Sequence, residues 1–119
     1  MATFDKITLS GSTDGRPILV AATATPGTTI HTASSTATVY DEVWLYATNN
    51  DTVSRTLTVE FGGTTSPNDI IKVTLAAQSG LFLIMPGLVL KGNATPLVVK
   101  AFGSVANQIT ISGWVNRIS

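Results

Sequence analysis

The single histidine is the residue with the most obvious capacity for catalysis, because a nucleophile activated by histidine is a standard route to hydrolysis. His31 lies in the Thr-rich run Thr28–Thr32, with no nucleophile signature around it. A zinc site needs several His, Cys or carboxylate ligands, and the chain has one histidine and no cysteine. We therefore expect His31 to be a solvent-facing or interface side chain, and we expect neither a catalytic histidine nor a metal site.

The two glutamates could form a glycosidase pair only if their carboxylates faced each other across a sugar cleft. Glu42 and Glu60 lie on residues 39–48 and Arg55–Phe61, which read as paired strands. Glu60 falls on the polar face of its strand. Asp41 and Glu42 are adjacent, so their side chains point to opposite faces. We interpret these carboxylates as solvated surface charges.

No other motif predicts chemistry. Asp14, Asp51 and Asp69 lie in turn-like segments, where Asp caps its own backbone. Their spacing does not match a dedicated Ca²⁺ loop, and the chain has neither a P-loop nor a GxGxxG motif. We expect no cofactor and no enzymatic activity, and therefore a packing or binding role.

Size and composition predict one globular domain. The chain has 119 residues, a common single-domain length. Seven basic and seven acidic residues cancel and are spread along the chain, whereas a nucleic-acid binder shows a basic stripe. No apolar stretch is long enough to span a membrane. The first residues, MATFD, lack a basic segment followed by an apolar run, so we expect no secretory signal. Only 12% of residues are charged while 44% are hydrophobic, which suggests that other subunits cover part of the surface.

Alternation of apolar and polar residues with a period of two predicts an all-β fold. We expect about seven to nine short strands in a single antiparallel β-sandwich or barrel, jelly-roll-like in type. A Pro26-Gly27 turn should join residues 18–25 to a partner strand, Thr28–Thr32. The remaining expected strands are residues 39–48, 55–61, 70–76, 81–85 with a continuation over 88–90, 97–102 and 108–115.

Strand alternation also predicts the core and a second apolar surface. Leu57, Val59 and Phe61 should be buried, with Ile109 and Ile111 on the facing surface. Large apolar residues then remain on the opposite sides of the same strands, and such a second face usually contacts a partner. The alternative is that loops or an N-terminal arm cover it. The candidate interface residues are Trp44, Tyr46, Phe82, Ile84 and Trp114.

The domain should span residues 1–119. Residues 1–38 hold few bulky apolar side chains, so we expect this segment to form an arm laid on a neighbour or an edge hairpin of the sandwich.

Four segments give the chain a resemblance to a known class of proteins. They are STDGRPILVAATATPGTTIHTA (residues 12–33), YDEVWLYATNND (40–51), SGLFLIMPGLVL (79–90) and ITISGWVNRIS (109–119). This pattern resembles small virion proteins encoded among the structural genes of tailed bacteriophages. The resemblance covers nearly the whole chain but contains no catalytic motif, so it transfers no site residue.

The resemblance implies a capsid decoration (cement) protein that binds the major capsid protein lattice and stabilises the head. Such proteins are small β domains and often trimers, so it implies a homotrimer on the capsid surface of the virion, made in the host cytoplasm. Two rival classes stay open. One is a receptor- or carbohydrate-binding module that uses Trp44 and Trp114 as exposed stacking platforms, and the other is a tail or head–tail connector component.

Overall fold

The computed structural model describes residues 2–119 and contains nine β-strands, with no helix in that range. Accordingly, none of these residues forms a helix that could cross a membrane. The strands are β1 (Phe4–Thr8), β2 (Ile18–Leu19), β3 (Thr28–Thr32), β4 (Tyr40–Asn49), β5 (Arg55–Phe61), β6 (Ile70–Leu75), β7 (Phe82–Lys91), β8 (Val98–Gly103) and β9 (Ile109–Ile118).

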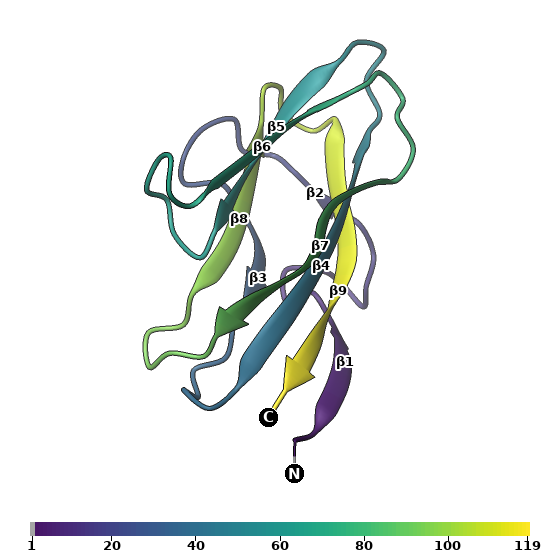
Figure 1. The fold of residues 1–119 in the computed structure, drawn as a ribbon. Coiled ribbons are helices and arrows are strands. Elements are labelled where there is room, and N and C mark those ends of the chain that lie inside the picture. The colour runs from purple at the N-terminus through teal and green to yellow at the C-terminus, as the bar shows by residue number, and fades with distance from the viewer. Residues whose placement is uncertain (1) are drawn as a thin grey trace.

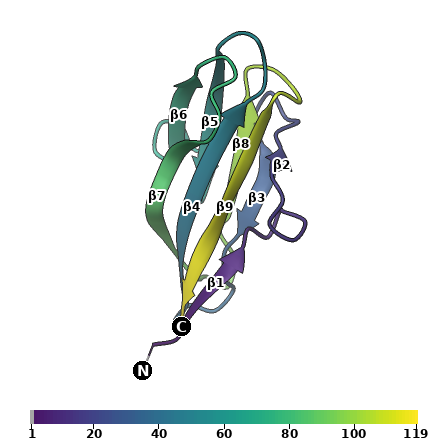
Figure 2. The same ribbon diagram turned by 90° about the vertical axis from the view of Figure 1, so that its right-hand side faces the viewer.

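These strands form two antiparallel sheets packed face to face (Figure 1). Sheet A has the order β1-β9-β4-β7, and the short β2 also pairs with β9. Sheet B has the order β3-β8-β5-β6. Figure 2 shows sheet A in front of sheet B, with both chain ends at the same end of the molecule. The predicted all-β antiparallel sandwich is confirmed.

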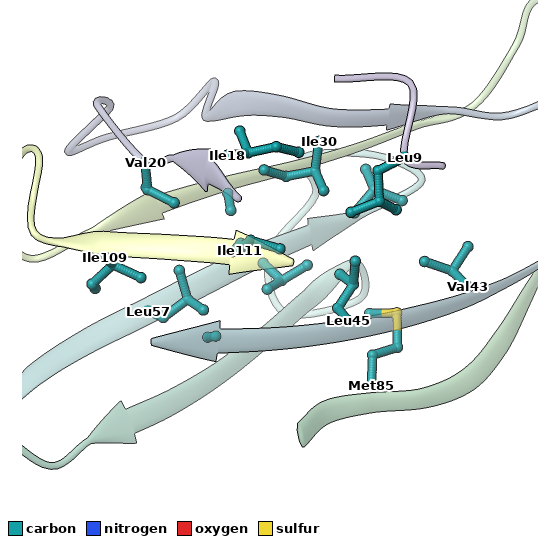
Figure 3. Close-up of a cluster of buried hydrophobic side chains, with 14 of the residues drawn as sticks. Leu9, Ile18, Val20, Ile30, Val43, Leu45, Leu57, Met85, Ile109 and Ile111 are labelled. Carbon is teal, nitrogen blue, oxygen red and sulfur yellow. The ribbon is translucent and has the colours of Figure 1, made fainter. Parts of the chain in front are cut away.

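Alternating apolar residues from both sheets fill the space between them (Figure 3). In β4, Val43, Leu45 and Ala47 are fully buried while the residues between them are partly exposed. Such alternation is what a strand shows when one of its faces packs on a core. Ile109 and Ile111 of β9 face sheet B as predicted, and Leu57 and Val59 of β5 are buried as predicted. Phe61 is only half-buried and packs against the rim of this core.

The strand partners differ from the sequence-based expectation. β2 pairs with β9 and β3 with β8, so the predicted hairpin around Pro26-Gly27 does not form. Likewise β4 and β5 lie in different sheets and do not pair. In both places the connecting loop carries the chain from one sheet to the other. Period-two alternation reports which face of a strand is buried, but not which strand lies beside it.

Residues from the first third of the chain form edge strands of both sheets. β1 pairs with the C-terminal half of β9, and β3 pairs with β8 at the edge of sheet B, so the two do not form one edge hairpin. The segment also contributes the fully buried side chains Leu9, Val20 and Ile30 to the core.

Strand β7 runs through Pro86 and Gly87 instead of ending there. Its pairing with β4 shifts by one residue at two places, between Val43 and Trp44 and between Leu45 and Tyr46. β7 is the free edge of sheet A, and bulges and proline are typical of such edges because they hinder pairing with another chain.

The half-buried position of Phe61 changes the expected effect of its truncation. Leu57→Ala should lower the free energy of unfolding by about 2–5 kcal/mol, because Leu57 is fully buried and its loss leaves a cavity. Phe61→Ala should cost less than Leu57→Ala, because Phe61 keeps part of its surface in water. Urea denaturation of the two variants tests this order, and a larger loss for Phe61→Ala would contradict the assignment of the core.

Candidate functional site

Three of the five predicted interface residues gather on the outward face of sheet A. Trp44 of β4 and Trp114 of β9 are direct cross-strand partners. Their rings stack with centroids 5.4 Å apart and an angle of 7° between the planes. Tyr46 packs on Trp114 with centroids 5.9 Å apart. Stacked aromatic pairs of this kind contribute about 0.5–1.5 kcal/mol beyond the burial of their area.

Polar neighbours hold these rings in place. The indole N–H of Trp44 donates to Glu42 Oε1 at 2.7 Å, and Asn116 Nδ2 donates to the same oxygen at 3.0 Å. These two hydrogen bonds, chiefly that from Trp44, lower the pKa of Glu42. The ammonium of Lys6 lies 5.3 Å from the centre of the Trp114 ring, within the range of a cation–π contact. Both charges are therefore engaged within the face.

The ring faces of the two tryptophans are already occupied. A Cβ atom added at Gly87 would lie 3.1 Å from the Trp44 ring, so the backbone of β7 packs closely beneath that ring. Trp114 lies against Trp44, Tyr46 and Lys6, and its Nε1 is buried without a hydrogen-bond partner among residues 2–119. Each tryptophan therefore has one ring face covered by the other tryptophan, and Tyr46, Lys6 and Gly87 crowd the rest of the pair.

The other two predicted interface residues do not join this cluster. The bulge between Leu45 and Tyr46 leaves Ile84 unpaired, and Ile84 packs partly against the core. Phe82 pairs with Ala47 at the end of the strand and is 47% exposed. Phe82 and Ile84 therefore do not share the outward face with Trp44, because the extra residue reverses the alternation that we had assumed.

Sequence reasoning missed other apolar members of the outward face. Leu83 is the cross-strand partner of Tyr46, and Val89 is the partner of Glu42. Both side chains are substantially exposed. For Val89 the Pro86-Gly87 pair is a signal in the sequence, because these residues in a strand mark a bulge. The bulge at Ile84, which turns Leu83 outward, has no such signal. We call the resulting surface the sheet-A face and define it by Tyr40, Trp44, Tyr46, Leu83, Val89 and Trp114.

A buried polar network lies on the core side of the same strands. His31 of β3 and Asp41 of β4 are 1% and 0% exposed, and His31 Nε2 lies 2.7 Å from Asp41 Oδ2. Arg117 of β9 donates to both oxygens of Asp41, from Nε and Nη2, at 2.8 Å each. The network links sheet B to sheet A. The predictions that His31 faces solvent or an interface and that Asp41 is a solvated surface charge are therefore wrong.

Both nitrogens of the His31 ring are engaged. The backbone N–H of Ser10 can only donate, and it lies 3.1 Å from Nδ1, so Nδ1 accepts and the proton resides on Nε2, toward Asp41. Burial lowers the pKa of His31, although Asp41 opposes that effect. Burial alone would raise the pKa of Asp41, but the hydrogen bonds from Arg117 and His31 outweigh it and lower that pKa. In this arrangement His31 has no free nitrogen with which to deprotonate a nucleophile.

Glu60 is also buried, although it points away from the core of the sandwich. It is 1% exposed because the β2–β3 connection folds over the outer side of sheet B. The backbone N–H of Gly27 donates to Glu60 Oε1 at 2.7 Å, and the Thr25 hydroxyl donates to Oε2. The prediction of a solvated surface charge is wrong for Glu60. Glu60 and Glu42 lie in different sheets and do not face each other as a glycosidase pair would.

No group of three or more His, Cys, Asp or Glu side chains is arranged to hold a metal ion within the part of the chain that the structure describes.

The His31 network predicts a fold that weakens in mild acid. Because the pKa of His31 lies below its usual 6.5 in the folded chain, the unfolded chain binds a proton first as the pH falls below that value. Unfolding is then progressively favoured. The pKa of Asp41 is lowered from 3.8 in the folded chain. The unfolded chain therefore takes up this proton first as the pH falls below 3.8, and the fold loses stability a second time.

Urea denaturation at about pH 7 and about pH 5 should show the first loss, and His31→Gln should reduce it because glutamine does not titrate. An unchanged pH dependence in His31→Gln would contradict this account of the network.

Comparisons with protein-family models, with curated proteins and with solved structures found no match to this chain. They assign no family, so the function has to be argued from the geometry of the chain itself.

Proposed function

We propose that this chain is a structural virion protein of a tailed bacteriophage that decorates the capsid and has no catalytic role. In this proposal the sheet-A face docks on the major capsid protein lattice. The observation that carries it is the cluster of Trp44, Tyr46 and Trp114 on the outside of a sandwich that already has a complete core. Tryptophan and tyrosine are enriched among the residues that dominate binding energy at protein interfaces.

The charges on this face favour contact with another protein. Glu42 is held by Trp44 and Asn116, and Lys6 lies on the Trp114 ring. When a partner covers the face, Glu42 and Lys6 keep these contacts. This limits the free-energy cost of removing water from the two charges. Around the aromatic cluster, Leu83 and Val89 add exposed apolar surface.

The size of the chain is compatible with several such contacts. A standard interface covers about 800 Å² on each partner, which is roughly an eighth of the 6204 Å² surface of this chain. A capsid decoration protein needs no chemistry, because it adds contacts across subunit boundaries that must break before the shell opens. Assembly as a homotrimer, which we also propose, would present three copies of the sheet-A face and strengthen binding by multivalency.

The alternative function, a carbohydrate-binding module that uses Trp44 and Trp114, receives less support from the geometry. Such a module stacks a sugar ring on the flat face of an exposed aromatic side chain, and here the ring faces pack on each other, on Lys6 and on the backbone at Gly87.

A lysine placed on the sheet-A face should weaken docking. Leu83 is 41% exposed and lies opposite Tyr46, with no acidic side chain as its cross-strand partner, so Leu83→Lys would add a charge to this face with little effect on folding. Thr74→Lys is the matched control, because Thr74 is an exposed residue of the edge strand β6 of the other sheet. The measurement is co-sedimentation of each variant with capsids of the encoding phage that lack this protein.

We expect Leu83→Lys to lower occupancy at least about 10-fold, as burying an unpaired charge at an interface does, and Thr74→Lys to bind as the parent does. Equal binding of both variants, or loss in Thr74→Lys alone, would contradict docking through the sheet-A face.

A further inference from the structure

Residues 9–11, which we call the latch segment, fasten the N-terminal part of the chain to β3. The backbone N–H of Ser10 donates to His31 Nδ1 at 3.1 Å, and the N–H of Gly11 donates to the carbonyl oxygen of Ile30 at 2.9 Å. A Cβ atom added at Gly11 would lie 2.7 Å from that oxygen, so the two backbones are in close contact. His31 is therefore one of the anchor points of the segment that follows β1.

Strand β1 has little other hold on the molecule. Four of its five residues are exposed, and Ile7 is only partly buried. The strand lies at the edge of sheet A and pairs with β9 alone. Leu9, which is 1% exposed, is the first buried side chain of the described residues. The position of β1 therefore depends on its backbone pairing with β9 and on the latch segment.

Protonation of His31 would break its hydrogen bonding on one side only. On the Asp41 side, Nε2 already donates to the carboxylate, and a positive ring would strengthen this bond. On the Ser10 side, Nδ1 would gain a proton and could no longer accept, so two N–H groups would face each other across 3.1 Å. Ser10 and Thr32, whose N–H donates to the Ser10 hydroxyl, are both exposed, so water can replace the bonds that Ser10 gives up. The cost of protonation therefore falls on the latch segment and not on the contact between His31 and Asp41.

The surroundings of His31 set the direction in which pH acts on the latch segment. Burial has the largest effect and lowers the pKa of His31 from 6.5, while Asp41 of β4 raises that pKa and Arg117 of β9 lowers it. The cross-strand neighbour on β8 is the apolar Val99. When the latch segment opens, Nδ1 meets water and the pKa of the ring returns toward 6.5. The open form therefore binds the proton first as the pH falls, and its population rises.

We propose that His31 is an acid-sensitive switch that releases the latch segment and β1 while the two sheets remain packed. Release uncovers the edge of β9 along residues 114–118 and takes Lys6 away from the ring of Trp114. The switch is a property of the isolated chain and does not depend on docking. Only its consequence, a change of the sheet-A face in acid, rests on the proposed function.

The test is amide hydrogen exchange of the ¹⁵N-labelled full chain at about pH 7 and about pH 5, corrected for the intrinsic exchange rate at each pH. The amide of Gly11 reports on the latch segment, that of Thr3 on the pairing of the N-terminal end with Ser119, and that of Val20 on the core. The opening constants of Gly11 and Thr3 should exceed that of Val20 at both pH values. They should rise by up to about 10-fold for each pH unit below 6.5, as the uptake of one proton requires.

Two results of this experiment would overturn the proposal. Equal opening constants for Gly11 and Val20 would mean that the latch segment opens only when the whole chain unfolds. An opening constant of Gly11 that does not change with pH would mean that His31 does not control it.

His31→Asn separates titration from hydrogen bonding, because asparagine can present an acceptor near the position of Nδ1 but does not titrate. In this variant the opening constant of Gly11 should lose its pH dependence, and dispersed spectra would show that the chain remains folded. Asp5→Asn is the matched control, because it removes an exposed titratable group from β1 itself, and it should keep the pH dependence of the parent. Loss of that dependence in Asp5→Asn, or its persistence in His31→Asn, would contradict the assignment of the switch to His31.

Discussion

The pairing of β4 with β9 is the constraint on which the rest of the structure depends. It runs without a bulge from Tyr40 opposite Ile118 to Asn49 opposite Ile109. Because side chains alternate along a strand, this one register places Leu45 and Ile111 in the core and Trp44 beside Trp114 outside. A slip of one residue would expose the core residues and bury the aromatic cluster. Core and candidate docking surface are therefore two consequences of the same alignment.

The His31–Asp41–Arg117 network acts on the same register from the inside. Asp41 and Arg117 are cross-strand partners in β4 and β9. The two hydrogen bonds between their side chains stabilise this register of β4 against β9. His31 extends the network to sheet B. Removing Arg117 would leave the buried carboxylate of Asp41 without its cation, so the network favours one alignment of the strands and one packing of the sheets.

The sequence predicted where the strands lie better than it predicted which strands pair. Alternation in residues 39–48 and 55–61 identified the strands and placed Leu57 and Val59 in the core, because a half-buried strand repeats every two residues. The same alternation places Asp41 on the side of Val43, so its burial could have been inferred. The burial of Glu60 could not, since it depends on a loop that folds over the outside of sheet B. Strand order and the bulge at Ile84 depend equally on contacts between distant segments.

The outward face of sheet A and the outward face of sheet B have different chemistry, and this difference is the basis of the functional account. One presents stacked aromatic rings and exposed aliphatic side chains, whereas on the other the β2–β3 connection covers the carboxylate of Glu60. The most direct test is an electron cryomicroscopy reconstruction of the phage particle at a resolution that shows strands. The account predicts density for this sandwich on the capsid, with Trp44 and Trp114 toward the shell. Density with sheet B against the shell, or located only in the tail, would contradict it.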